Sequence, residues 1–497
     1  MQTIDLIIIF GYLIGVTLFG VWFSSKQKTT EDYFVGDRSV PWWAIAMSIV
    51  ATETSTITFI SVPGIVFAKG GNFQFLQLVF GYMLGRVVIA LLFIPMYFKG
   101  ELLTVYQLLG TRFGTKVKML ASGLFVVMRN IADGIRLLLT AIVLAAVYVA
   151  FQPQANVEYV IIGSVVLLGV VMIVFTYYGG MEAVIWVEVV QLVIYIGGAI
   201  AAAVVIANQV DGGFSGAIEL GTKFEKFSLF DFTFDLTKTY TFWAGLIGGC
   251  FLTMSTHGTD QYLVQRYLCT DKPKRAALAL LTSGGVILVQ FIGFLFIGVL
   301  LFAYYQPFNM PEYATATGAF PFTGGDKVFP DFITKHMPSG ISGLVVAAIF
   351  AAALSSSLNS IAATFVQDLY KPFKPKADDK HILKVSHWLT LVFGIVQIIV
   401  ALIIMTQNES ALTQALSIAT FFNGPVLGVF LVGAFVKRAK ETHALIGMLV
   451  SVAVMFYVKY GTSIAWTWYA LFGSLLTVFV AWLATYIISS KSDEVTN

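Results

Sequence analysis

The chain has 497 residues, of which 58% are hydrophobic and only 11% are charged, and its formal net charge is +3. A soluble globular protein carries about 25% charged residues. The composition therefore excludes a soluble enzyme, a disordered protein and a nucleic-acid-binding protein. It predicts an all-α polytopic protein embedded in a lipid bilayer.

Apolar runs of about 20 residues, the length that crosses a bilayer, occur about thirteen times along the chain. They cover residues 3–23, 42–68, 73–98, 118–150, 157–178, 181–207, 240–268, 276–304, 338–368, 385–405, 410–436, 442–458 and 463–489. The first run lacks a basic segment before it and a small-residue cleavage site after it. We therefore expect a retained helix rather than a signal peptide.

The basic residues favour one orientation in the membrane. With the N-terminus outside, the predicted cytoplasmic loops hold most of the lysines and arginines, with Arg266 counted among them at the end of the seventh run. The predicted outside loops hold few: Lys69, Lys223, Lys226, Lys238, Lys327, Lys335 and Lys459. This bias predicts an N-out, C-in protein of the cell (inner) membrane. The long outside loop 305–337 holds either short helices over an external vestibule or a plain connector.

Two of the predicted spans carry dense polar runs that favour a broken helix. The second holds a carboxylate among hydroxyls, ahead of Pro63 and Gly64: Thr52, Glu53, Thr54, Ser55, Thr56 and Thr58. Hydroxyls compete with helical hydrogen bonds, and Pro-Gly weakens the helix further. The seventh holds His257, Gly258 and Asp260. Interrupted spans at matching places in two halves indicate a transporter site, where freed carbonyls can coordinate a cation.

Three further spans carry polar residues that point to ion binding or ion pairing. In the ninth, Ala352, Ser355 and Ser356 share one helical face, and a carbonyl with two hydroxyls suits sodium. In the fourth, Asp133 is spaced to pair with Arg129 and Arg136; the excess arginine could meet Glu53 or an anionic solute. The sixth holds Glu188, an intramembrane carboxylate that could neutralise a second cation.

These residues resemble the sodium/solute symporter family, in particular its bacterial sialic acid branch. The similar motifs lie at residues 31–44, 51–64, 177–191, 263–268, 347–360 and 423–439. The resemblance implies a five-plus-five inverted-repeat core, formed by helices two to eleven, with broken helices two and seven and with sodium as the coupling ion. It implies a first repeat at 42–207, a second at 240–438, and peripheral segments at 1–41 and 441–497 within a single transport domain.

The resemblance also implies the site residues. Sodium would be bound by the carbonyls of Ala51, Thr54 and Ala352 and by the hydroxyls of Ser355 and Ser356. Glu188 stands where the sialic acid branch has a sodium-binding aspartate. The solute pocket maps onto Glu53, Ser55, Thr58, Phe73, Gln77 and Arg136.

The chain departs from that pattern at two places. Glu53 replaces a threonine, which puts an acid in the pocket, and the serine stretch around Ser355 is shorter, which leaves one or two sodium sites open. We expect import of a small polar solute with sodium by alternating access, and favour a sugar, a polyol or a sugar acid. An amino acid or carboxylate is the alternative, with Glu53 holding an ammonium and Arg136 a carboxylate.

Two other classes of function are alternatives to sodium symport. A proton-coupled carrier would use Glu53, Asp133 or Glu188 as its titrating group. A membrane enzyme would need a metal or nucleophile cluster, and the sequence has neither HExxH nor GxSxG. The partners expected are therefore the solute, sodium and the lipid bilayer, with the oligomeric state left open.

Overall fold

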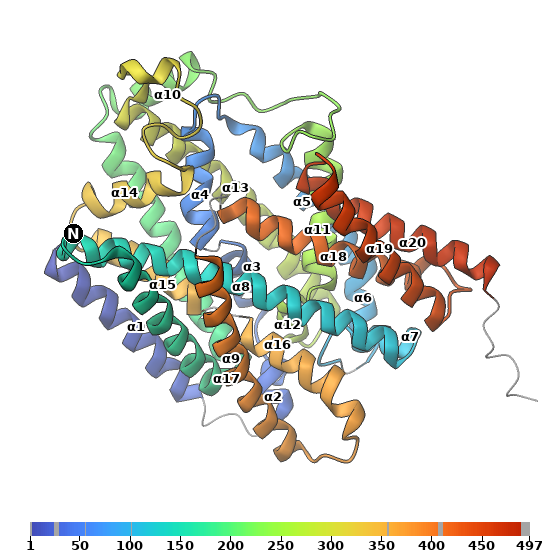
Figure 1. The fold of residues 1–497 in the computed structure, drawn as a ribbon. Helices are drawn as coiled ribbons and strands as arrows, with labels where there is room; N and C mark the ends of the chain where they lie inside the picture. The colour runs from blue at the N-terminus through green and yellow to red at the C-terminus, as the bar shows by residue number, and fades with distance from the viewer. Residues whose placement is uncertain are drawn as a thin grey trace, which may run out of the picture.

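The structure is a computed structural model that describes residues 2–23, 29–54, 56–100, 102–354, 357–405 and 411–488. Within these ranges, the side chains at 57, 150, 351–354, 411–416 and 418–420 are not described. Every regular element in the described residues is a helix, which confirms the predicted all-α class (Figure 1). The helices that form unbroken parts of the bundle include α1 (Thr3–Phe23), α5 (Leu76–Val88), α8 (Thr115–Phe151), α13 (Pro273–Tyr305), α17 (Asp379–Ile404), α18 (Ala411–Phe435), α19 (Glu441–Gly461) and α20 (Tyr469–Ile487), and the longest is α9 (Val157–Ala207).

Three of the predicted spans are divided in two. The second consists of α3 (Trp42–Glu53) and α4 (Thr56–Phe67), which are bent by 55° relative to each other. The seventh contains α11 (Gly249–Thr259) and α12 (Gln261–Leu268), and the ninth contains α15 (Ile341–Leu354) and α16 (Leu358–Thr364). The predicted breaks in the second and seventh spans are therefore confirmed.

The structure supports many spans without fixing their number. Eight helices of the described residues are long and apolar enough to cross a membrane, or nine if α3 and α4 are one span. Helix α9 covers two predicted spans, and Gly180 interrupts it with φ 61°, a backbone conformation that glycine adopts readily. The count of thirteen stays a prediction.

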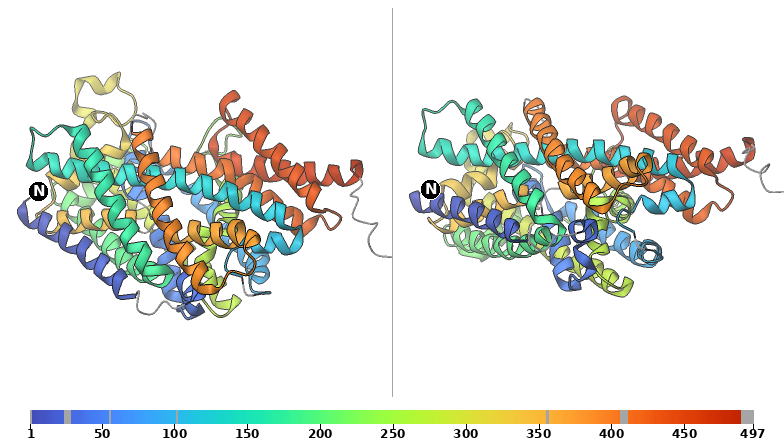
Figure 2. Two further views of the ribbon diagram at one scale, coloured as in Figure 1. Left: turned by 60° about the horizontal axis from the view of Figure 1, so that its bottom comes forward. Right: turned by 90° about the horizontal axis from the view of Figure 1, so that it is seen from below.

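The first and last helices flank the bundle. Figure 2 shows α1 along one side and the C-terminal helices α19 and α20 projecting at the opposite side. Helix α1 packs on α9 and α15, whereas α20 packs on α18 and α19. The broken helices α3, α4, α11 and α12 lie between these flanks.

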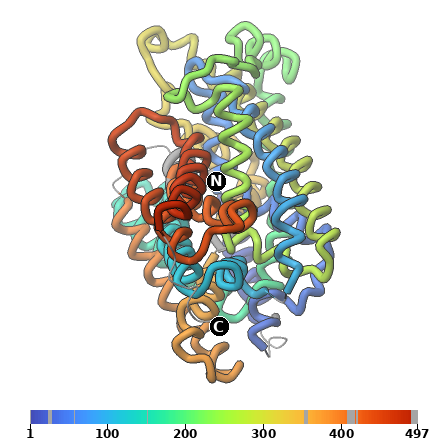
Figure 3. The backbone as a smooth tube through the Cα atoms, turned by 90° about the vertical axis from the view of Figure 1, so that its right-hand side faces the viewer, coloured from blue at the N-terminus to red at the C-terminus, as the bar shows by residue number. Residues whose placement is uncertain are grey.

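The two long loops predicted outside lie at one end of the molecule, as the green and yellow segments of Figure 3 show. The first holds α10 (Gly213–Lys223) and the second holds α14 (Val328–Lys335), besides short 3-10 turns. For the loop 305–337, the prediction of short helices is therefore confirmed over a plain connector.

Both loops are fastened to α4, the second half of the broken second span. A Cβ on Gly64 of α4 would lie 2.1 Å from the carbonyl oxygen of Gly325, so only glycine allows this approach. From the other loop, the buried Lys226 ammonium donates hydrogen bonds to the carbonyls of Val66 (2.8 Å) and Ala68 (2.7 Å). The Val66 carbonyl lies in the last turn of α4, where carbonyls have no partner within the helix, so Lys226 satisfies it. The Ala68 carbonyl lies just beyond the helix and also accepts from the backbone N–H of Gly71 at 2.9 Å.

Candidate functional site

At the break between α3 and α4, hydroxyl groups bond to backbone carbonyls of the interrupted helix. The Thr58 hydroxyl donates to the Glu53 carbonyl across the break, at 2.9 Å. The Thr54 hydroxyl lies 2.7 Å from the Val50 carbonyl oxygen and 2.8 Å from Oε1 of Gln290 on α13. The hydroxyl-rich sequence thus provides the local partners that an interrupted helix needs in a bilayer.

The broken second span is also tied to the ninth. The Thr56 hydroxyl donates to the carbonyl of Ile349 on α15 at 3.0 Å, and the Thr140 hydroxyl of α8 lies 3.2 Å from Thr56 Oγ1. All of these hydroxyl groups are buried. The two segments predicted to share a sodium ion are therefore in direct polar contact.

The seventh span breaks at Asp260, two residues after the glycine that the sequence singled out. Asp260 has φ −87° and ψ 119°, and its carboxylate accepts from the backbone N–H of Tyr262 at 2.9 Å, which caps α12. The Gly258 carbonyl accepts a hydrogen bond from the Tyr97 hydroxyl. An aspartate N-cap explains the break better than glycine flexibility does.

Glu53 forms an ion pair with an arginine and a polar contact with a histidine, each from another span. Its Oε2 accepts from Nη2 of Arg86 on α5, and its Oε1 lies 2.9 Å from Nε2 of His257 on α11. The prediction that the excess arginine of α8 meets Glu53 is therefore wrong, because Arg129 and Arg136 have other partners. His257, singled out as a lone histidine, connects the two broken spans.

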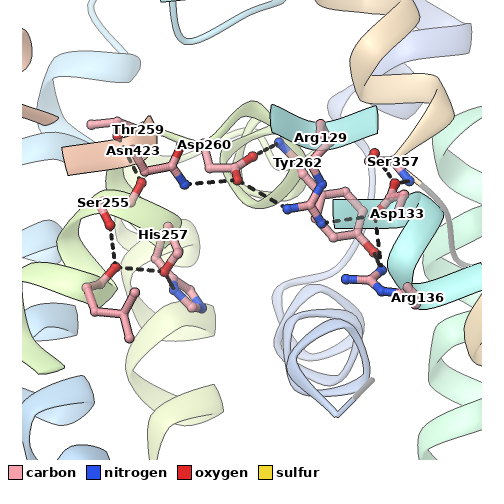
Figure 4. Close-up of polar contacts among 12 residues, drawn as sticks. Arg129, Asp133, Arg136, Ser255, His257, Thr259, Asp260, Tyr262, Ser357 and Asn423 are labelled. Atoms are coloured by element: carbon pink, nitrogen blue, oxygen red, sulfur yellow. Dashed lines mark hydrogen bonds and ion pairs between the residues drawn. The ribbon is translucent and has the colours of Figure 1, made fainter. Parts of the chain in front are cut away.

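Arg129, Asp133 and Arg136 pair on one face of α8, as their spacing predicts. Asp133 Oδ1 lies 3.5 Å from Arg129 Nη2 and 3.7 Å from Arg136 Nη1. Arg129 continues to Asp260 at 3.3 Å, and Arg136 donates to the Tyr262 hydroxyl at 3.2 Å. Figure 4 shows this chain of contacts from the break of the seventh span to Ser357.

Three arginine side chains lie around the ring of Tyr262. Its ring is 4.1 Å from the guanidinium carbon of Arg129, 4.6 Å from that of Arg266 and 5.6 Å from that of Arg136. Arginine is attracted to the face of an aromatic ring, the more so when desolvated. Sequence reasoning missed Tyr262, because tyrosine in an apolar helix gives no local signal.

Glu188 is fully buried and is held by polar groups of two other helices, α3 and α12. Its carboxylate pairs with Arg266 of α12, accepts from Ser48 of α3, and accepts from Thr52 at 3.1 Å. Arg266 is thus a buried helix residue, and its assignment to a cytoplasmic loop is wrong. The role of Glu188 as a sodium ligand stays a prediction.

The structure leaves several predicted site residues without a test. Ser55, Ser355 and Ser356 lie outside the described residues, and Ala352 is described only by its backbone, within α15. Ala51 is buried near the end of α3, three residues before Thr54.

Phe73 and Gln77 contact the outside loop rather than the carboxylate of Glu53. The Phe73 ring lies 5.3 Å from that of Phe227. Gln77 accepts from the backbone N–H of Asp231 at 3.0 Å and donates to the Tyr240 carbonyl at 3.2 Å. Of the predicted solute residues, the structure joins Glu53 and Thr58 to each other and places Phe73 and Gln77 beneath the loop.

Comparison with known proteins agrees with this architecture. Residues 33–451 match the model of the sodium:solute symporter family. The sodium/sialic acid symporter NanT of Aliivibrio fischeri is 32% identical over 99% of this chain and 95% of its own length. The sodium/sialic acid symporter SiaT of Proteus mirabilis is 33% identical over 96% of this chain and 93% of its own.

A solved structure of a Na+-coupled sialic acid symporter, in a substrate-bound outward-open state, superposes with a TM-score of 0.84 at 31% identity and covers 98% of both chains. The chain therefore belongs to the sodium:solute symporter family. It is a multi-pass membrane protein with the inverted-repeat fold, and it couples the symport of a small solute to sodium.

Proposed function

We propose that this protein imports a sugar acid of the sialic acid type together with sodium. The observation that carries the proposal is the contact between the two broken spans, in which Glu53 Oε1 lies 2.9 Å from His257 Nε2. Glu53 stands at the break of the second span, where the Thr54 and Thr58 hydroxyls bond to the backbone carbonyls of Val50 and Glu53. Hydroxyls and a compensated carboxylate suit a polyhydroxylated solute. Two relatives that match nearly the whole chain carry the name sodium/sialic acid symporter.

We infer that sodium binds between the second and ninth spans. The carbonyls of Ala51, Thr54 and Ala352 and the hydroxyls of Ser355 and Ser356 would be its ligands. The hydrogen bond from Thr56 to Ile349 supports this placement, since it joins the two segments one helical turn before Ala352. Sodium would strengthen that junction and complete the pocket before the solute closes the outer side.

The solute pocket in this proposal consists of Glu53, Ser55, Thr58, Phe73, Gln77 and Arg136. Glu53 and Thr58 lie at the break itself, and Phe73 and Gln77 lie where an outside loop covers the path to it. An amino-acid substrate is less well supported. It needs a free carboxylate and a free guanidinium, whereas Glu53 pairs with Arg86 and Arg136 donates to Tyr262.

The orientation and the division of the chain belong to the same proposal. The N-terminus lies outside and the C-terminus in the cytoplasm. The repeats span 42–207 and 240–438, and the segments 1–41 and 441–497 are peripheral. The positions of α1, α19 and α20 at the flanks of the bundle support the peripheral assignment.

Uptake by the purified protein in liposomes tests the function. An inward sodium gradient should drive accumulation of labelled sialic acid, and an equal potassium gradient should not. With two sodium ions per monoanionic solute, an inside-negative potential should increase uptake, because each net charge moved through 100 mV contributes about 2.3 kcal/mol. With one sodium ion, transport is electroneutral and the potential should have no effect. Uptake that ignores sodium but follows a proton gradient would favour the proton-coupled carrier. Sodium-driven uptake of an amino acid instead of a sugar acid would favour the other alternative.

A further inference from the structure

Both oxygens of the Glu53 carboxylate contact nitrogen atoms of other spans, one from an arginine and one from a histidine. Oε2 accepts from Arg86 and Oε1 lies 2.9 Å from His257 Nε2. The three residues come from α3, α5 and α11, so they assemble only in the folded protein. We call Glu53, Arg86 and His257 the charged trio.

The carboxylate is the accessible member of the charged trio. The Arg86 side chain is 0% exposed and that of His257 is 3% exposed, whereas Glu53 keeps 13% of its side-chain surface open. A solute that reaches the charged trio therefore touches Glu53 before it touches Arg86 or His257.

Packing and hydrogen bonding hold the Arg86 side chain in place. A Cβ on Gly284 of α13 would lie 2.8 Å from Cδ of Arg86, so the arginine fills a slot that the glycine leaves open. Its Nη1 also reaches the Tyr82 carbonyl at 3.4 Å. An arginine inside a membrane span is costly unless a carboxylate compensates it, and Glu53 is the acid with which Arg86 pairs.

The net charge of the charged trio is never negative. Arginine is always protonated in proteins. The charges of Arg86 and Glu53 therefore cancel when the His257 imidazole is neutral, and one positive charge remains when it is protonated. The carboxylate can still accept hydrogen bonds, because each of its oxygens has more than one lone pair.

We propose that Arg86 and His257 are specificity-determining residues that convert Glu53 into a charge-compensated acceptor for solute hydroxyl groups. This inference rests on the proposed function, in which Glu53 lines the solute pocket. It explains how a transporter with a carboxylate in its proposed solute pocket can accept an anionic sugar. A bare carboxylate would repel the solute carboxylate and attract an ammonium group instead.

Substitution of Arg86 tests the inference directly. Arg86→Gln uncovers the Glu53 charge, and Glu53→Gln/Arg86→Gln removes both charges together. Sodium-dependent binding of sialic acid and of glucosamine, a cationic sugar, is measured with purified protein by thermal shift and by uptake competition. Arg86→Gln should weaken sialic acid relative to glucosamine by at least about tenfold. The double variant should recover most of that ratio, and Arg86→Lys should retain it.

The outcomes separate the inference from the proposed function. Stabilisation of every variant by sodium alone shows that the protein is folded. If the wild type binds neither sialic acid nor any other sugar acid, the proposed function fails, but the gain of glucosamine binding in Arg86→Gln and its loss in the double variant still test the inference. An unchanged ratio in Arg86→Gln, or a double variant no better than the single one, overturns it.

Discussion

The carboxylate of Asp133 binds Ser357 twice. The backbone N–H of Ser357 donates to Oδ2 at 3.1 Å, and the Ser357 hydroxyl donates to the same oxygen. The other oxygen, Oδ1, faces Arg129 and Arg136. Because Ser357 directly follows the two serines proposed to bind sodium, Asp133 fixes the start of α16 where the ninth span is interrupted.

Asp133→Asn should therefore weaken sodium binding more than solute binding. The amide lacks the negative charge that strengthens both hydrogen bonds from Ser357 and that compensates Arg129 and Arg136. Loss of such an outer partner typically costs about tenfold to a hundredfold in ion affinity. The sodium concentration that gives half-maximal uptake measures the effect, and Asn130→Leu is the control, because Asn130 bonds to Val126 within its own helix. An unchanged sodium dependence in Asp133→Asn would contradict this role.

Glu188→Gln should destabilise the protein strongly. It leaves the buried Arg266 without its carboxylate, and an uncompensated buried charge costs about 3–5 kcal/mol. Thermal unfolding in detergent measures the loss, and Glu188→Gln/Arg266→Gln should recover a substantial part of it. The double variant also tests Glu188 as a sodium ligand. If it is stable yet needs the same sodium concentration as the wild type, Glu188 has a structural role alone.

The free energy of unfolding should rise with pH because of the buried Lys226. Burial lowers the pKa of the Lys226 ammonium from its usual 10.5 to about 8 in the folded protein. Between about pH 8 and pH 10.5 the unfolded chain therefore holds a proton that the folded protein has released, so stability increases as pH rises through this window. The melting temperature of the wild type relative to Lys226→Met should increase from about pH 7 to about pH 10. The exposed Lys223→Met should show no such trend.

Cysteine labelling can establish the orientation in the membrane. Cys250 and Cys269 are both buried, so the native chain offers a low background. Thr222→Cys, in the first outside loop, should react with an impermeant maleimide in intact cells. Lys376→Cys, in a proposed cytoplasmic loop, should react only after permeabilisation. The reverse pattern would invert the proposed topology.

The two broken spans could be predicted because their causes are local. Hydroxyls around Thr54 and the polar run ending at Asp260 act on the backbone within a turn, so a single sequence reveals them. The same holds for the pairing of Asp133 with Arg129 and Arg136, which the helical period sets.

The partners of Glu53 and Glu188 could not be predicted in this way. Arg86 lies on another span, and Arg266 was assigned to a loop because it stands near the end of an apolar run. Such pairs depend on how helices pack, which no local pattern specifies. The energetic cost of burying an arginine in a membrane gives one indication of its partner. Arg86 needs a nearby carboxylate, and the spans contain few.

The close approach of Gly64 to Gly325 and the reach of Lys226 to Val66 have a mechanical consequence. They tether both of these loops to α4, so α4 cannot tilt without moving the loops with it. Opening of the transporter on this side would then be a joint movement of α4 and both loops instead of a movement of α4 alone.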